Sequence, residues 1–535
     1  MAKNGSTWRV RAGVRLGAGA IALGALVAGA LAAHASAVPA APRGPGPGLV
    51  VTTAGGTLRG TSAGRTDEFL GIPYAAPPVG PLRWQPPQPA APWTGIRDAT
   101  AFAPHCPQPP SAFGVASTSE NCLYLNVYTP PGTRAPAGNL PVMVWIHGGA
   151  FIAGESDDYN PAGLVRHGVI VVTINYRLGA LGFLADAALA SHPGGSSGNY
   201  GLMDQQAALR WVQANIRQFG GNPRNVTLSG ESSGGLSVLS QLVSPGARGL
   251  FSRAIVESGT YDLTQATLAT ADTAGQAFAA KVGCASQSAA CLRALPVSTI
   301  VDNEDFAGYK PDIDGTVLTQ SIGPALASGQ FNRVPVINGT NRDEWRMFVA
   351  QEQLDGAPPV TAANYQASIA ALLSVSATAA TAIAAEYPLS AYSSPPVALG
   401  AVGTDEIFAC PALTVDESLS TYVPTYAYEF NDRNAPERYL APVGFPYGAA
   451  HESEVQYLFT LQNTPFPGVL TAPQQQLAAA MKQYWTNLAK TGSPASLWPR
   501  FDRTSQQMLS LVPPRPQVET GFAAEHHCAF WALAS

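Results

Sequence analysis

The chain of 535 residues carries 30 basic and 35 acidic side chains, which gives a formal net charge of −5. Hydrophobic residues make up 46% of the chain and charged residues only 12%. A chain of this length and apolarity buries a large core, which excludes an intrinsically disordered protein. The sequence is neither basic nor rich in lysine, so we expect no nucleic-acid partner.

The first 37 residues have the pattern of a secretory signal peptide. Four basic residues begin the segment: Lys3, Arg9, Arg11 and Arg15. A glycine- and alanine-rich run over 16–33 follows, and its weak hydrophobicity favours cleavage over anchoring. Ala35-Ser36-Ala37 matches a small-residue cleavage site. We therefore expect cleavage near Ala37, a secreted protein without stable membrane insertion, and one folded domain over 38–535.

An even number of cysteines in an exported chain predicts disulfide bonds. The six cysteines are Cys106, Cys122, Cys284, Cys291, Cys410 and Cys528. Six cysteines allow fifteen connectivities, and pairing in sequence order is the simplest. None of them has the C-x-x-C spacing of zinc sites, so we expect no metal to be bound through them.

Buried strands and helices alternate along the mature chain. Apolar runs over 140–146, 169–174 and 334–338 predict strands, and helical spacing of apolar residues predicts a helix over 207–216. The alanine-rich segment 362–386 is also expected to be helical, as a packing helix of a cap over the sheet. This alternation is typical of an α/β protein with a mostly parallel sheet wrapped by helices.

A candidate nucleophile follows from the pattern G-x-S-x-G, in which a sharp strand-to-helix turn exposes a serine hydroxyl. The pattern occurs around Ser62, Ser196 and Ser232. The first copy lies between two short strand-like runs and predicts a hairpin turn, and the second follows a proline and predicts a loop. Only around Ser232 does a β-favouring run, 225–229, precede the pattern and a helical pattern, 235–242, follow it. Ser232 is therefore the predicted nucleophile.

A serine hydroxyl needs a base, and in wound hydrolases the chain order is serine, acid, histidine. This order leaves His451, His526 and His527. The last two precede Cys528 directly, where a disulfide would hold them, so His451 is the better candidate base.

The acid that orients the histidine should follow a strand between the nucleophile and the base. The strand at 334–338 leads to Asp343 and Glu344, and spacing alone does not separate these two acids. A second strand, 140–146, leads to His147-Gly-Gly-Ala150, where glycines allow peptide N–H groups to converge on an oxyanion. The N–H of Ser233 is the expected further donor.

Several longer segments resemble the type-B carboxylesterase family, which includes the cholinesterases. They are Phe69–Gly80, Ser119–Pro130, Asn175–Phe183, Gly198–Gln205 and Phe219–Gly235. The resemblance covers nearly the whole mature chain. It implies an α/β-hydrolase fold with helical cap insertions and a Ser-Glu-His triad.

The resemblance selects Glu344 over Asp343, because the family's acid closes a similar Gly-x-x-(Arg/Lys)-Asp-Glu stretch, and it supports His451. It also implies roles for residues around the triad. The expected oxyanion donors are the amides of Gly149, Ala150 and Ser233, with Gly148 shaping the loop, and Ser258 is expected to support the histidine.

The resemblance further implies the pairs Cys106–Cys122, Cys284–Cys291 and Cys410–Cys528. The loop closed by the first pair contains Phe113 but no tryptophan. A tryptophan in this loop holds the choline cation in cholinesterases, so its absence argues against a choline-ester specialist.

The sequence therefore predicts a secreted serine hydrolase of carboxylic esters that acts on a small-molecule or lipid ester and needs no metal or other cofactor. The sequence does not separate esters from amides or carbamates as substrates, and two further alternatives remain open. One is a lipase or sterol esterase acting on long-chain esters. The other is a non-catalytic binding protein on the same fold, although the serine, acid and base candidates are all present.

Overall fold

The computed structural model describes residues 49–534, apart from 134–138, 191–195, 287 and 306–307. The expected signal peptide over 1–37 lies outside the described residues, as does its cleavage site. Both therefore stay predictions.

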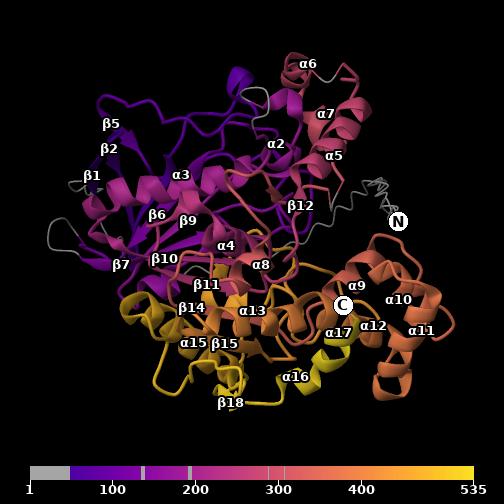
Figure 1. The fold of residues 1–535 in the computed structure, drawn as a ribbon. Helices are drawn as coiled ribbons and strands as arrows, with labels where there is room; N and C mark the ends of the chain where they lie inside the picture. The colour runs from indigo at the N-terminus through magenta and orange to yellow at the C-terminus, as the bar shows by residue number, and fades with distance from the viewer. Residues whose placement is uncertain (1–48, 134–138, 191–195, 287, 306–307, 535) are drawn as a thin grey trace, which may run out of the picture. The chain divides into compact units, whose positions relative to one another are not determined.

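One large sheet organises the described part of the chain (Figure 1). Its eleven strands lie in the order β18-β17-β15-β14-β11-β10-β7-β9-β6-β4-β3. In chain order these strands are β3 (Thr61–Ala63), β4 (Thr66–Pro73), β6 (Tyr124–Thr129), β7 (Leu140–Ile146), β9 (Ile170–Ile174), β10 (Gly221–Glu231), β11 (Arg253–Glu257), β14 (Val336–Asn341), β15 (Thr425–Phe430), β17 (Met508–Leu511) and β18 (Gln517–Glu519). Strands from β9 to β17 are parallel neighbours, and antiparallel strands form both edges. The predicted α/β class with a mostly parallel sheet is confirmed.

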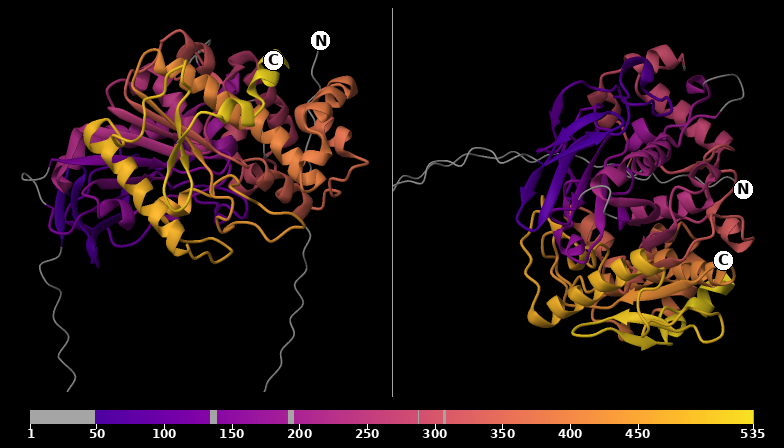
Figure 2. Two further views of the ribbon diagram at one scale, coloured as in Figure 1. Left: turned by 90° about the horizontal axis from the view of Figure 1, so that it is seen from below. Right: turned by 90° about the vertical axis from the view of Figure 1, so that its left-hand side faces the viewer.

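Apolar side chains alternate between the two faces of the sheet, because successive residues of a strand point to opposite sides. In β7, Val144 belongs to the core on one face together with Leu239 of α4 (Ser233–Val243). The next residue, Trp145, belongs to the core on the other face with Trp485 of α15 (Ala472–Thr491). Helices therefore cover both faces, as the two views of Figure 2 show.

Helices form where the sequence pattern predicts them, with different bounds. The helix expected over 207–216 is the second half of α3 (Tyr200–Asn215). The alanine-rich segment forms α10 (Tyr365–Leu373) and α11 (Ala377–Glu386), which meet at a bend of 112°. Ser374, in the left-handed conformation with φ 54°, ends α10 and causes this bend. Figure 1 shows both helices beside α12 (Pro395–Gly403).

A long apolar helix runs from Pro395 to Ser420 as α12, the π-helical turn η6 (Thr404–Ala409) and α13 (Cys410–Ser420). This helix is long and apolar enough to cross a membrane, with a mean hydropathy of 1.2 over an 18-residue window. However, 72% of that window is buried inside the protein. Helices that are apolar all round are also found in the cores of large proteins, and we attribute the apolarity of this one to packing.

Three disulfides tie distant or irregular segments together. The structure pairs Cys106 with Cys122, Cys284 with Cys291, and Cys410 with Cys528. These are the pairs that the family resemblance implies. The last pair joins α13 to α17 (Cys528–Ala534), near the end of the chain.

Candidate active site

Ser232 lies at a sharp turn between the end of β10 and the start of α4, with φ 56° and ψ −122°. This conformation is strained for a residue with a side chain and persists only where the surroundings impose it. Here the peptide N–H of Ser232 donates to the carbonyl of Glu257 at 2.9 Å. A Cβ on Gly234 would lie 2.1 Å from the carbonyl oxygen of Ile146, so only glycine fits behind the turn. The sharp strand-to-helix turn expected from the sequence is thus present, and Ser232 as nucleophile stays a prediction.

The other two copies of the serine pattern lie in different surroundings. Ser62 is in strand β3, which pairs with β4 as a hairpin, so it lies beside the turn rather than in it as expected. Ala63 is the last residue of β3 and pairs with Thr66, so the hairpin turn consists of the two residues between them. Ser196 lies in a loop before α3, as expected.

The structure brings Ser232, His451 and Glu344 together in one hydrogen-bonded chain. Nε2 of His451 lies 2.8 Å from Oγ of Ser232, and Nδ1 lies 2.6 Å from Oε2 of Glu344. The other carboxylate oxygen, Oε1 of Glu344, accepts from the Thr340 hydroxyl at 2.6 Å and from the Asn341 N–H at 2.7 Å. These donors fix the carboxylate, and the carboxylate in turn orients the imidazole toward the serine.

Asp343, the other candidate acid, faces away from this chain of hydrogen bonds. Its carboxylate forms ion pairs with Arg346 at 2.6 Å and Arg433 at 2.7 Å, and accepts from the N–H of Ala449 at 3.0 Å. Burial raises the pKa of Asp343, but the hydrogen bond from Arg433 and the charge of Arg346 hold the pKa below its ordinary value. Asp343 thus anchors the loop that carries His451.

His526 and His527, the alternative bases, pair with other carboxylates. His526 lies between Asp405, at 2.5 Å, and Glu429, at 2.7 Å, and His527 lies 2.7 Å from Glu386. Burial lowers the pKa of His526, but the two carboxylates outweigh burial and raise the pKa to about 10. His526 is therefore a buried cation at neutral pH, with a structural role.

This raised pKa predicts a pH dependence of stability. Between the pKa of an unfolded histidine and the folded pKa of about 10, only the folded chain binds this proton. The contribution of His526 is therefore complete below pH about 6.5 and falls by about 1.4 kcal/mol per pH unit until it is lost near pH 10. We expect His526→Gln to lose this part of the slope.

The measurement is the free energy of unfolding in denaturant at pH 6, 8 and 9.5 for both proteins. Groups away from His526 titrate equally in the two proteins, so the difference between their slopes reports His526 together with its partners Asp405 and Glu429. Parallel slopes over the whole range would refute the assignment of a charged, buried imidazole.

The loop after β7 carries two of the three peptide N–H groups predicted as oxyanion donors. Gly149 has φ 97° and Ala150 has φ 56°. Within the described part of the chain, the peptide N–H groups of Gly149, Ala150 and Ser233 have no hydrogen-bond acceptor. A Cβ on Gly148 would lie 2.8 Å from Oε2 of Glu231, so this position requires a very small residue. Free N–H groups held by a strained loop are suited to a negatively charged oxygen.

His147, at the start of this loop, is buried, and burial lowers its pKa to about 4. The imidazole is therefore neutral at pH 7. Its Nδ1 lies 2.9 Å from the carbonyl oxygen of Gly148, and its own carbonyl accepts from the hydroxyl of Tyr176 at 3.0 Å. These contacts hold the loop without adding a charge beside the free N–H groups.

Two phenylalanines that the sequence analysis did not find flank the imidazole of His451. The ring centroids of Phe348, in α9 (Arg346–Leu354), and Phe408, in η6, lie 5.2 Å and 5.1 Å from that of His451. The π-helical turn places Phe408 here, and such turns are frequent at functional sites. No local sequence signal marks a π-helical turn, so this contact was not predictable.

Two buried glutamates beside the histidine were also missed. Oε1 of Glu231 lies 3.4 Å from Nε2 of His451, and Glu454 accepts from the side-chain amide of Asn341 at 2.5 Å. Burial, reinforced by Glu452 and Glu454, raises the pKa of Glu231 well above its ordinary value. Its surroundings therefore favour the uncharged form of Glu231, which limits the negative charge next to the imidazole. The only sequence signal for Glu231 was its position directly before the predicted nucleophile, in Gly230-Glu-Ser.

Ser258 forms no hydrogen bond with His451 among the described residues, and its expected support of the histidine stays a prediction. It lies just after β11, its N–H donates to Gly339, and its buried hydroxyl has no hydrogen-bond partner among the described residues. Both nitrogens of the imidazole are paired, with Ser232 and with Glu344.

Among the described residues, two clusters of histidine and carboxylates have ligand atoms within 4.8 Å of one another, close enough to hold a metal ion. One consists of Glu231, His451 and Glu452 and overlaps the serine–histidine pair. The other consists of His105, Glu155 and Asp157. Neither cluster was predicted from the sequence, where only the cysteines were considered as metal ligands.

A sequence model of the carboxylesterase family matches residues 47–531. The fumonisin B1 esterase of Sphingopyxis macrogoltabida is 35% identical over 94% of this chain and 93% of its own length. The human cocaine esterase is 35% identical over 89% of this chain and 88% of its own length. The para-nitrobenzyl esterase of Bacillus subtilis is 34% identical over 86% of this chain and 94% of its own length.

The chain belongs to the carboxylesterase family and has its α/β-hydrolase fold. It is a carboxylic ester hydrolase, as its esterase relatives are.

Proposed function

We propose that the protein hydrolyses esters through an acyl-enzyme intermediate, with Ser232 as nucleophile, His451 as base and Glu344 as the orienting acid. The observation that carries this proposal is the unbroken hydrogen-bonded chain from Oγ of Ser232 through both imidazole nitrogens to Oε2 of Glu344. Three protein groups in this order are sufficient for acyl transfer, without a metal or organic cofactor.

The reaction follows from the positions of these groups. Oγ of Ser232 attacks the ester carbonyl carbon while Nε2 of His451 takes the hydroxyl proton. The negative charge develops on the carbonyl oxygen, which the N–H groups of Gly149, Ala150 and Ser233 bind. The bond to the alcohol breaks as His451 gives that alcohol its proton. A water molecule, deprotonated by His451, then attacks the acyl group and releases the acid and Ser232.

We propose small-molecule carboxylic esters as substrates, because the relatives named above are esterases of chemically different compounds. The Cys106–Cys122 loop supports the exclusion of a choline-ester specialist. Its one aromatic residue, Phe113, packs against Tyr439 with ring centroids 5.3 Å apart. Three disulfides support the proposal that the chain folds in an oxidising compartment and is secreted.

A series of p-nitrophenyl esters with increasing acyl length, together with a triglyceride emulsion, tests this proposal. We expect the highest kcat/KM on soluble short-chain esters and no jump in rate when the ester passes its solubility limit. A steep rise in rate on the emulsion would instead identify a lipase. Absence of turnover on every ester would leave only a binding function.

A further inference from the structure

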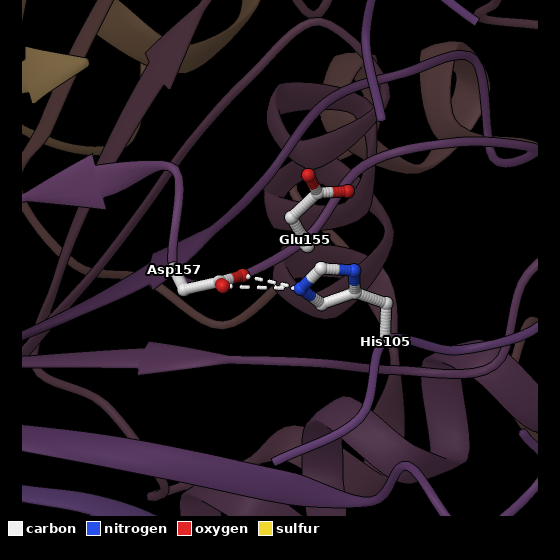
Figure 3. Close-up of side chains that lie close together, drawn as sticks. All are labelled: His105, Glu155 and Asp157. Atoms are coloured by element: carbon white, nitrogen blue, oxygen red, sulfur yellow. Dashed lines mark hydrogen bonds and ion pairs between the residues drawn. The ribbon is translucent and has the colours of Figure 1, made fainter. Parts of the chain in front are cut away.

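A second group of charged side chains lies outside the hydrogen-bonded chain of Ser232, His451 and Glu344. His105 directly precedes the disulfide-bonded Cys106, and Glu155 and Asp157 follow the oxyanion loop in sequence. Figure 3 shows Asp157 at the edge of the His105 imidazole, with Glu155 alongside. Both oxygens of Asp157 lie 3.0 Å from Nε2 of His105. The ligand atoms of all three side chains lie within 4.8 Å of one another.

The backbone around the group is firmly held. Gln108, two residues after Cys106, accepts from the N–H of Gly154 at 2.8 Å and donates to the carbonyl of Gly154 at 3.1 Å. The hydroxyl of Ser117 donates to the carbonyl of His105 at 2.7 Å. The two segments that carry the three side chains are therefore fixed to each other before any ligand binds, as a binding site requires.

The carboxylates have less hydrogen bonding than their burial demands. Glu155 is 2% exposed, and its two oxygens share a single N–H, that of Val115, at 3.2 and 3.1 Å. Oδ1 of Asp157 is buried and, apart from its ion-pair contact with His105, has no hydrogen-bond partner among the described residues. A carboxylate offers about four acceptor positions, so most of those positions here are unused.

The charges are also unbalanced. In the described part of the chain, no lysine or arginine forms an ion pair with Glu155 or Asp157, and His105 is the only cationic partner. The group therefore places two carboxylates beside one imidazole, with no lysine or arginine among the described residues to balance the second carboxylate.

We propose that His105, Glu155 and Asp157 bind a divalent transition-metal ion of the zinc class. One imidazole and two carboxylates are typical zinc ligands, with metal–ligand bonds of about 2.0–2.2 Å. Around a tetrahedral ion such bonds place ligand atoms about 3.4 Å apart, which is longer than the 3.0 Å between Nε2 of His105 and Asp157 and lies within the 4.8 Å that bounds all three ligand atoms. Small shifts of the side chains would complete the site, with water as the fourth ligand.

A bound ion would fasten the Cys106–Cys122 loop to the segment that follows the oxyanion loop. None of the three ligands belongs to the proposed catalytic machinery. We therefore assign the ion a structural role, in which it stabilises the folded enzyme.

Titration of metal-free enzyme with ZnCl₂ by calorimetry tests the site directly. We expect one ion per chain and a rise in Tm of about 2 °C or more at saturation, because the ion binds only the folded state. The Co²⁺ form should show the visible absorption of a four-coordinate site. Glu155→Gln keeps an acceptor for the N–H of Val115 but loses the ligand charge, so it should abolish binding and the rise in Tm.

Glu386→Gln is the matched control, since it removes a carboxylate from the isolated His527 pair, which has no third ligand among the described residues. It should bind Zn²⁺ like the parent. The zinc-loaded parent should also keep its p-nitrophenyl esterase activity. Absence of stoichiometric binding would overturn the proposal. So would binding that survives Glu155→Gln while ester turnover is lost, because the ion would then be held by His451, Glu231 and Glu452.

Discussion

Ser232→Ala is expected to lower kcat for p-nitrophenyl esters by about 10,000-fold or more while the protein stays folded. The hydroxyl is the only group at the elbow that supplies the bond-forming oxygen. The remaining slow turnover would come from the free N–H groups and substrate binding alone. Alanine keeps the backbone N–H bond to Glu257 and adds no atom, so Tm should change little. Steady-state kinetics with thermal melting checks both expectations.

Ser196→Ala is the natural control, because Ser196 has the same G-x-S-x-G surroundings in sequence but lies in a loop, where its hydroxyl donates to the hydroxyl of Thr316 at 3.4 Å. It should keep the kcat of the parent. Turnover by Ser232→Ala within tenfold of the parent would contradict the assignment of the nucleophile.

Glu344→Gln is expected to lower kcat by about 1,000- to 10,000-fold with a smaller effect on KM. The amide is nearly isosteric and can still accept from Thr340 and Asn341 with one oxygen. The NH₂ group of the glutamine then faces Nδ1 of His451, and Nδ1 would have to accept a hydrogen bond from it instead of donating one. The imidazole would then carry its proton on Nε2 and could no longer take the proton of Ser232. Steady-state kinetics on p-nitrophenyl acetate gives both constants.

Asp343→Asn separates the two adjacent acids experimentally. Asp343 holds two arginines and the N–H of Ala449, so its loss should lower Tm. Its carboxylate does not contact His451, so kcat of the folded enzyme should fall far less than in Glu344→Gln. The opposite ranking of the two variants would make Asp343 the functional acid.

The sequence was most informative where one local pattern determines a structure. The predicted strand 140–146 matches β7, a parallel strand between two covered faces, because it is an apolar run of which five of seven residues are buried. The elbow at Ser232 was separable from its two copies because strand, turn and helix signals follow one another there. The strand predicted at 334–338 begins at Val336 instead and continues to Asn341, since polar residues at its end are buried by neighbouring strands.

The remaining features depend on contacts between distant segments. Spacing could not separate Asp343 from Glu344, because the choice depends on which carboxylate meets a loop 107 residues away. The positions of Phe408 and Glu454 beside His451 depend on a π-helical turn and on the course of a loop. The same holds for His105, Glu155 and Asp157, which come together only because two segments joined by Gln108 fold against each other.

The most direct test of the catalytic chain is labelling with a fluorophosphonate, followed by intact-mass measurement and peptide mapping. We expect one adduct per chain, located on Ser232, with ester turnover lost in proportion to labelling. Glu344→Gln should be labelled far more slowly than the parent. Full labelling of another residue, or undiminished turnover after modification of Ser232, would contradict the account.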